Sequence, residues 1–179
     1  MFSSSSLTHR FAGTADLGAI HTLMDAAIAE LQKPYLDATQ IASSGLLMGL
    51  DTQLIADQTY FVVEIDGSIA GCGGWSRRAT LYGGDDTPGR SPALLDPRTD
   101  AARIRAMYTH PAHVRKGVGR LILQVCERHA TTEGFTRAEL VATLAGEPLY
   151  TAAGYVAIER FQDDRGGVAV PLVRMVKVF

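Results

Sequence analysis

The chain has 179 residues, enough for one domain with a substantial core and too few for two full domains. A hydrophobic fraction of 46% and a charged fraction of 20% exclude a disordered chain. The net charge of −2 argues against a nucleic-acid-binding protein, because surfaces that neutralise phosphates are usually basic. There is no apolar run long enough to span a membrane, and the start MFSSSSLTHR lacks a signal peptide's apolar centre. We expect a cytoplasmic protein with neither a membrane nor a nucleic acid as partner.

The cysteines and histidines do not predict a metal site. Cys72 and Cys126 lie inside apolar runs at no metal-ligand spacing, so we expect buried free thiols. His110 and His113 flank a proline in a basic turn and have no carboxylate or thiolate nearby in the sequence. The serine-rich residues 1–8 are expected to be disordered, and residues 9–179 to form a single domain.

The first third of the chain predicts a short strand followed by two helices. The strand is expected over residues 10–13. Apolar residues then recur at three- and four-residue steps over residues 17–31, which indicates a helix that ends before Pro34. A second helix is expected over residues 37–50.

A β-hairpin follows, formed by residues 60–65 and 69–75. Asp66-Gly67 supplies the positive φ angles that a two-residue turn requires. The second arm contains three glycines (Gly71, Gly73 and Gly74), which indicate a bulge or a close approach of another backbone.

The rest of the chain alternates strands with helices after one long irregular segment. Residues 77–100 are expected to be either a functional loop or a disordered insertion. Strands are then predicted over 102–109, 137–143, 155–161 and 168–179, and helices over 118–133 and 147–153. The resulting order, β-α-α-β-β-β-α-β-α-β-β, predicts an α/β fold in which a mixed central sheet has interleaved helices.

The stretch HVRKGVGR, residues 113–120, has the composition of a phosphate cradle. It lies between a predicted strand and a predicted helix, so backbone N–H groups at the helix start are free to bind an anion. Gly117 and Gly119 allow close approach to the backbone, and Arg115, Lys116 and Arg120 add positive charge.

Two common nucleotide-binding motifs do not fit this stretch. A P-loop requires lysine after its glycine and then a hydroxyl residue, and a dinucleotide fingerprint requires a third glycine where Ile122 stands. The simplest alternative is a helix start with solvated basic residues.

Two longer stretches resemble a known family. AMYTHPAHVRKGVGRLIL, residues 106–123, resembles motif A of the GCN5-related N-acetyltransferases (GNAT), and GEPLYTAAGY, residues 146–155, is similar to that family's second hallmark. One departure is Val114, which stands where the family usually has Gln or Arg. The resemblance implies the acyl-CoA N-acyltransferase fold and acetyl-CoA as cosubstrate.

The resemblance also implies roles for individual residues. Met107 and Thr109 would present backbone groups to the acetyl carbonyl and the pantetheine arm, with Tyr108 between them. Splayed strands at residues 106–109 and 140–143 would flank the thioester. The pyrophosphate would be held by Arg115, Lys116, Gly117, Val118, Gly119 and Arg120. Tyr150 occupies the family position of the general acid, although without the resemblance it would be interpreted as a core aromatic.

The general base and the acceptor are not assigned. His110, Glu139, Glu147, Asp100 and an ordered water chain are all candidates for the base.

Four other side chains do not decide which acceptor the protein uses. Arg103 and Arg105 lie on one face of their strand, where they would either favour an anionic acceptor or form a solvated edge. Trp75 and Tyr82 would either line the acceptor pocket or pack in the core.

The combined expectation is an N-acetyltransferase that moves an acetyl group from acetyl-CoA to a primary amine of a small molecule or peptide. Attack would be direct, in a ternary complex, because neither cysteine lies near the motifs. The alternatives are a non-catalytic acyl-CoA-binding module and an enzyme that uses a longer acyl-CoA. A homodimer is compatible with the sequence, but no residue indicates one.

Overall fold

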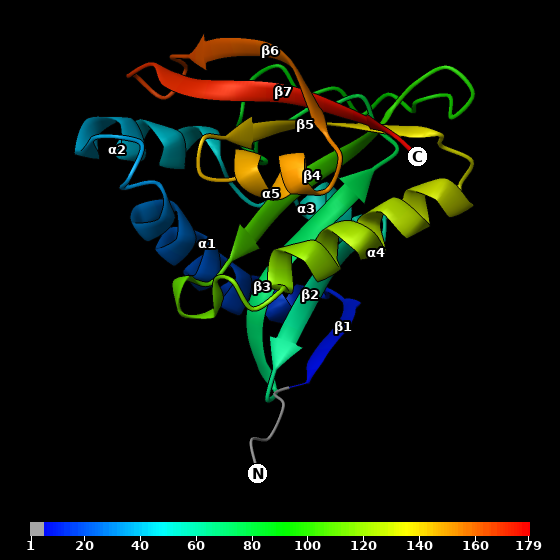
Figure 1. The fold of residues 1–179 in the computed structure, drawn as a ribbon, viewed down its shortest axis with the longest axis horizontal. Coiled ribbons are helices and arrows are strands. Elements are labelled where there is room, and N and C mark those ends of the chain that lie inside the picture. Colours follow the sequence, from blue (N-terminus) through cyan, green and yellow to red (C-terminus); the bar gives the residue numbers. More distant parts are fainter. Residues whose placement is uncertain (1–5) are drawn as a thin grey trace.

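The computed structural model describes residues 6–179, and its centre is a seven-stranded mixed sheet (Figure 1). The strands are β1 (Leu7–Phe11), β2 (Tyr60–Ile65), β3 (Ser68–Ser76), β4 (Ala102–Thr109), β5 (Arg137–Thr143), β6 (Val156–Asp163) and β7 (Val170–Val178). Their order across the sheet is β1-β2-β3-β4-β5-β7-β6. Only β4 and β5 are parallel neighbours among the described strands. The predicted α/β fold with a mixed sheet is confirmed.

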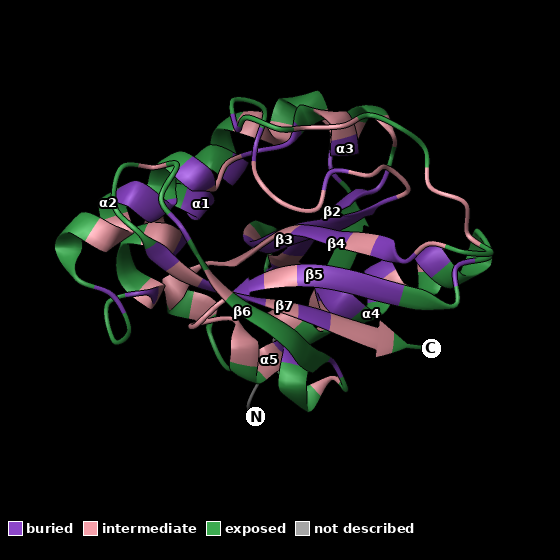
Figure 2. Ribbon diagram, turned by 90° about the horizontal axis from the view of Figure 1, so that it is seen from above, coloured by how far each residue is buried: buried purple, intermediate pink, exposed green. Residues whose placement is uncertain are grey.

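Five α-helices accompany the sheet: α1 (Leu17–Leu31), α2 (Ala38–Leu47), α3 (Thr52–Ala56), α4 (Val118–Thr132) and α5 (Glu147–Ala152). The helices cover both faces of the sheet, as the alternation of side chains along β2 shows. Phe61 and Val63 pack into the core with α4, whereas Tyr60 and Val62 pack into the core with α1 and α3. The central strands are largely buried, whereas β6 is an exposed edge (Figure 2). No helix of residues 6–179 combines the length and apolarity needed to cross a membrane.

The structure corrects three expectations in the N-terminal third. β1 starts at Leu7, so residues 7 and 8 belong to the sheet rather than to a disordered segment; residues 1–5 lie outside the described residues. α2 ends at Leu47 and not at residue 50. Met48 has an extended backbone, and Gly49 packs against the backbone of Gly84. The short helix α3 was not predicted.

The segment between β3 and β4, residues 77–100, is irregular but held in place. Arg78 is paired with Asp57 at 2.6 Å, and Arg90 with the buried Asp51 at 2.7 Å. Arg78 also forms an isolated β-bridge with Leu94. Of the two alternatives for this segment, the disordered insertion is therefore wrong.

The glycines of β3 have the role that their positions predicted. The register of β3 against β2 shifts at Ala70, which is the expected bulge in this arm, and the register against β4 shifts between Cys72 and Gly74 because β4 has an extra residue there. A Cβ atom at Gly71 would lie 2.4 Å from Val118, and one at Gly73 would lie 2.6 Å from Ile122. Because these positions lack side chains, α4 packs directly on the sheet.

β4 and β5 separate along their length, and this gap positions the site. They pair only where Ala102 and Arg103 face Ala138 and Glu139. Beyond that point Ala106 has a φ of +49°, a conformation that residues with a side chain adopt rarely. Its carbonyl oxygen accepts a 2.8 Å hydrogen bond from the Tyr60 hydroxyl, which fixes the bulge.

Candidate active site

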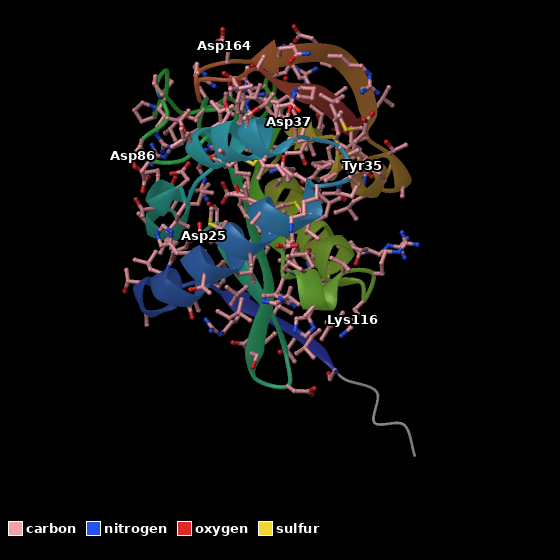
Figure 3. The ribbon with its side chains drawn as sticks, turned by 90° about the vertical axis from the view of Figure 1, so that its left-hand side faces the viewer. Asp25, Tyr35, Asp37, Asp86, Lys116 and Asp164 are labelled. Carbon is pink, nitrogen blue, oxygen red and sulfur yellow. The ribbon has the colours of Figure 1, made fainter. Side chains whose placement is uncertain are left out.

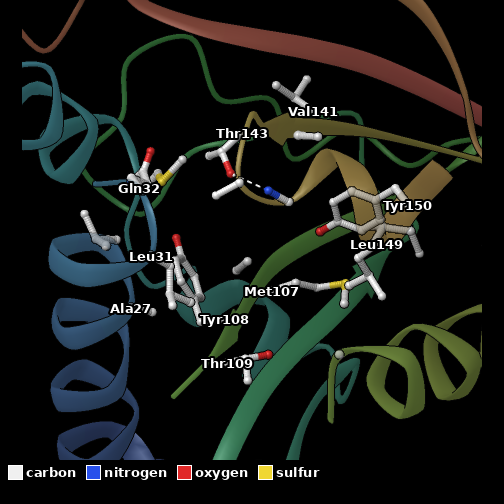
Figure 4. A pocket seen from close by; sticks show the side chains of 18 of the residues that line it. Ala27, Leu31, Gln32, Met107, Tyr108, Thr109, Val141, Thr143, Leu149 and Tyr150 are labelled. Atoms are coloured by element: carbon white, nitrogen blue, oxygen red, sulfur yellow. Dashed lines mark hydrogen bonds between the residues drawn. The ribbon is translucent and has the colours of Figure 1, made fainter. Parts of the chain in front are cut away.

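A single cavity of about 1050 Å³ lies where β4 and β5 separate (Figure 4). Its walls come from α1 and the residues around the end of α2 on one side, and from α4 and α5 on the other. This volume is at the upper end of the range for small-molecule sites. The cavity contains all but one of the residues that the sequence proposed for the site: Met107, Tyr108, Thr109, Arg115, Gly117, Val118, Gly119, Arg120 and Tyr150.

The turn before α4 has the backbone geometry of an anion-binding site. Arg115 and Gly117 both have positive φ angles, 63° and 85°, and Gly117 is the residue before the first turn of α4. The N–H groups at this helix start have no partner within the helix, and the helix dipole favours an anion there. His110 stabilises the chain that leads into this turn, because its Nδ1 atom accepts a hydrogen bond from the Ala112 N–H.

Gly119 is needed for space rather than for its backbone angles. A Cβ atom at this position would lie 2.9 Å from Cδ2 of Leu149, which is on α5. A larger residue would therefore push on the wall of the cavity between α4 and α5.

Lys116 is the predicted residue that does not line the cavity. Its Nζ atom lies 3.3 Å from Nδ1 of His113, and the residue is exposed. Figure 3 shows it at the surface of the turn. Arg115 and Arg120 are the two predicted cations that do line the cavity.

Met107 and Tyr108 project from opposite faces of β4. Met107 packs with the core beneath α4, and Tyr108 with the core beneath α1. Both line the cavity, because the cavity passes through the gap in the sheet (Figure 4). Tyr108 therefore presents its ring to the α1 side, whereas the sequence had placed it only along the cofactor.

Tyr150 combines the two interpretations that the sequence left open. Its ring is buried and packs edge-on against Tyr155 at 5.9 Å, as a core aromatic does. It also lines the cavity, and its hydroxyl points toward the gap between β4 and β5 (Figure 4). Burial raises the pKa of Tyr150, so the hydroxyl is protonated at neutral pH.

Comparison with known protein families shows which family this chain belongs to. The model of the acetyltransferase (GNAT) family matches residues 19–155. The chain belongs to the GNAT acetyltransferase family. The match includes most of α1, the turn before α4 and Tyr150, which all line the cavity.

Solved structures of GNAT acetyltransferases share the fold over nearly the whole chain. A GCN5-related N-acetyltransferase from Rhodopseudomonas palustris has a TM-score of 0.70 at 19% identity, over 100% of this chain and 98% of that one. PaiA N-acetyltransferase from Thermoplasma acidophilum, in complex with coenzyme A, gives 0.65 at 12%, over 97% and 99%. YncA from Salmonella typhimurium, with its cofactor acetyl-CoA, gives 0.62 at 21%, over 96% and 93%. No curated sequence matches the chain.

The three carboxylate candidates for a general base in this GNAT protein are engaged elsewhere, and His110 accepts a hydrogen bond from the Ala112 N–H. Glu139 is paired with Arg103 and Arg174, and Glu147 with Arg160. Asp100 accepts a hydrogen bond from the Asp96 N–H. No aspartate or glutamate of the described chain lines the cavity. The base remains unassigned.

The two arginines of β4 are also engaged. Arg105 is buried and pairs with Asp51 at 2.8 Å, and it donates to the carbonyl oxygens of Thr80 and Gly83. Arg103 pairs with Glu139. The two arginines therefore form neither a solvated edge nor a pair of cations that are free to bind an anionic acceptor.

The α1 side of the cavity was the part that sequence reasoning missed. It is formed largely by apolar side chains of α1, the end of α2 and β7, including Leu31, Met48 and Leu172. In the sequence these residues have the spacing of ordinary core positions. Tyr82 lines this side, as one alternative had it, whereas Trp75 is fully buried against Phe135. Among residues 6–179, no three His, Cys, Asp or Glu side chains are placed to hold a metal.

Proposed function

We propose that this protein transfers an acetyl group from acetyl-CoA to a primary amine by direct attack. One observation carries the proposal: a single cavity joins the helix-start turn at Gly117, the unpaired end of β4 and the Tyr150 hydroxyl. The turn suits the pyrophosphate, and the edge of β4 offers N–H and C=O groups to the pantetheine amides. Acetyl-CoA supplies the thioester whose acyl group is transferred.

The residues of the cavity divide the remaining work. The amine nitrogen bonds to the acyl carbon, the carbon–sulfur bond breaks, and Tyr150 gives its proton to the departing thiolate. The amine proton passes to water; among the described residues, His113 lines the cavity and no carboxylate does. Tyr150 regains a proton from solvent before the next cycle.

The buried thiols support direct transfer rather than an acyl-cysteine. Burial raises the pKa of Cys72 to about 12, and it also raises the pKa of Cys126. A thiol must ionise to act as a nucleophile, and neither cysteine lines the cavity.

The experiment is thiol release by the purified protein given acetyl-CoA and a panel of amines, with acetyl-CoA binding followed by calorimetry on the same sample. Release that depends on the amine is the expected result. Binding without release on any amine would favour the non-catalytic acyl-CoA-binding module. Faster thiol release from a longer acyl-CoA would favour an enzyme that uses the longer acyl group. Absence of acetyl-CoA binding would contradict the proposal.

A further inference from the structure

We propose that the acceptor is an apolar amine that is uncharged at neutral pH, such as an aromatic amine, rather than an alkylammonium or a polyamine. This inference rests on the proposed function, since it names the acceptor class of the same cavity. It follows from what the α1 side of the cavity contains and from what its polar groups are already bonded to.

The α1 side of the cavity is apolar. Six aliphatic or thioether side chains from α1, α2 and β7 line it: Ala27, Ile28, Leu31, Leu47, Met48 and Leu172. Figure 4 shows Ala27 and Leu31 on the wall that faces Tyr108. Burying apolar surface against such a wall contributes about 25 cal/mol per Å². The wall therefore favours an acceptor with a hydrocarbon or aromatic body.

A cationic amine finds no counter-charge in this cavity. No aspartate or glutamate lines it within residues 6–179, and the Asp163 carboxylate beneath Tyr82 is already bonded to Arg165 and to the Tyr82 hydroxyl. The face of the Tyr82 ring is also occupied, because the Arg165 guanidinium lies 5.2 Å from its centroid. An ammonium placed here would lose its hydration without an ion pair.

An anionic acceptor is disfavoured by the same reasoning. Arg105 is the arginine of the α1 side, and its guanidinium is committed to Asp51 and to two backbone carbonyls. Gln32 and Ser44 hydrogen-bond to each other. The remaining free cations of the cavity, Arg115 and Arg120, are at the turn before α4, where the cofactor phosphates are proposed to lie.

The absence of a carboxylate among the described lining residues fits the same acceptor; the one histidine that lines the cavity, His113, lies 3.3 Å from the Nζ atom of Lys116. An alkylammonium must lose a proton before its nitrogen can attack, whereas an aromatic amine has its lone pair delocalised into the ring and is already neutral at pH 7. Such an amine attacks without a carboxylate beside it. After the carbon–nitrogen bond forms, its proton passes to water.

The test uses two isomers of one formula, 4-ethylaniline and 2-phenylethylamine, the first neutral and the second cationic at pH 7. Calorimetry at pH 7 with the protein saturated with CoA measures the Kd of each, and thiol release measures kcat/KM. We expect at least tenfold tighter binding of 4-ethylaniline. Equal or tighter binding of 2-phenylethylamine, or binding of neither isomer, would overturn the inference.

A matched pair of variants isolates the role of charge. Leu31 lines the cavity and is partly exposed at the end of α1. Leu31→Glu adds a carboxylate, and Leu31→Gln adds the same shape without charge. We expect Leu31→Glu to bind 2-phenylethylamine at least tenfold more tightly than Leu31→Gln does, with acetyl-CoA affinity equal in both. Equal binding of this cation by the two variants would count against the inference.

Failure of the inference and failure of the proposed function give different results. If 4-ethylaniline binds selectively but no thiol is released, the preference of the cavity for a neutral apolar amine stands, but the amine is a ligand and not an acceptor, and the transferase proposal falls. If thiol is released and 2-phenylethylamine is the better ligand, the transferase stands and the acceptor class falls.

Discussion

Tyr150 is the residue on which the proposed chemistry depends most. Its ring has the packing of a core residue, and its hydroxyl faces the cavity with a pKa raised by burial. A structural role and a catalytic role therefore predict different outcomes when only the hydroxyl is removed.

Tyr150→Phe keeps the ring and removes the proton donor. We expect turnover to fall by roughly tenfold to a thousandfold, the usual contribution of a positioned acid. Calorimetry should show acetyl-CoA affinity unchanged. An unchanged rate would assign Tyr150 to the core alone.

Two substitutions at Gly117 test the anion site, because they differ in charge and have nearly the same shape. Asparagine and aspartate are the residues with side chains that best tolerate the φ of +85° found here. We expect Gly117→Asp to weaken acetyl-CoA binding at least tenfold relative to Gly117→Asn, because its carboxylate repels the phosphates. Equal affinities of the two variants, measured by calorimetry, would place the pyrophosphate elsewhere.

At the scale of elements, every α-helix and strand of the described residues except α3 was predicted, although β1 was expected three residues too late. α1 and α4 begin within a residue of the expected positions, and the Asp66-Gly67 turn has the positive φ angles that its sequence predicts. β1 is an exposed edge strand with the sequence LTHRF, so burial leaves little pattern in it. α3 has only five residues and is defined by the Asp51 cap rather than by periodicity.

The long segment 77–100 depends on long-range pairing that no local pattern reveals. Asp51 precedes α3 and accepts from both Arg105 of β4 and Arg90 of the segment. The carboxylate and the Arg105 side chain are each 2% exposed. This ion cluster joins three parts of the chain, and the cavity wall at Tyr82 and Gly83 belongs to the segment it holds.

Removing the charge of Asp51 should destabilise the fold strongly. In Asp51→Asn the Arg105 guanidinium stays buried without its counter-ion, which typically costs about 3–5 kcal/mol. Denaturant unfolding measures the change. Asp86→Asn, at an exposed position of the same segment, serves as the control and should change the free energy of unfolding by less than about 0.5 kcal/mol. Equal effects of the two variants would mean that the buried pair does not hold the segment.

For the whole molecule, resistance to acid follows from a similar contact. Asp163 at the end of β6 accepts hydrogen bonds from Arg165 and from Tyr82 of the long segment. The Arg165 hydrogen bonds lower the pKa of Asp163 to about 2. Because the folded pKa is below the unfolded value of about 3.9, this carboxylate stabilises the fold above that value, and its contribution is lost as the pH falls toward about 2.

Asp163→Asn should remove this part of the pH dependence. We expect the difference in Tm between the wild type and the variant to be constant above about pH 5 and to shrink between about pH 4 and pH 2. Thermal unfolding monitored by circular dichroism over this range measures it. A difference that stays constant to pH 2 would show that Asp163 does not carry the effect.

The sequence predicted residues that line the α4 side of the cavity and left the α1 side, the proposed acceptor side, undefined. Glycines, a proline and cations in fixed order identify a helix-start turn, because the phosphate chemistry acts through the local backbone. The acceptor wall is built from α1, α2 and β7, whose apolar residues resemble any core until the gap between β4 and β5 exposes them. Its lack of free charges was equally hidden, since Arg105 and Asp51 are 54 residues apart.

In the proposed reaction, acetyl-CoA and the amine occupy the two sides of one cavity together and react directly. Initial rates of thiol release, with both substrates varied, test this. We expect double-reciprocal lines that intersect, with no acetylated protein detectable by mass spectrometry when the amine is left out. Parallel lines together with a covalently acetylated protein would contradict it, because they would mean that the acetyl group passes through the enzyme first.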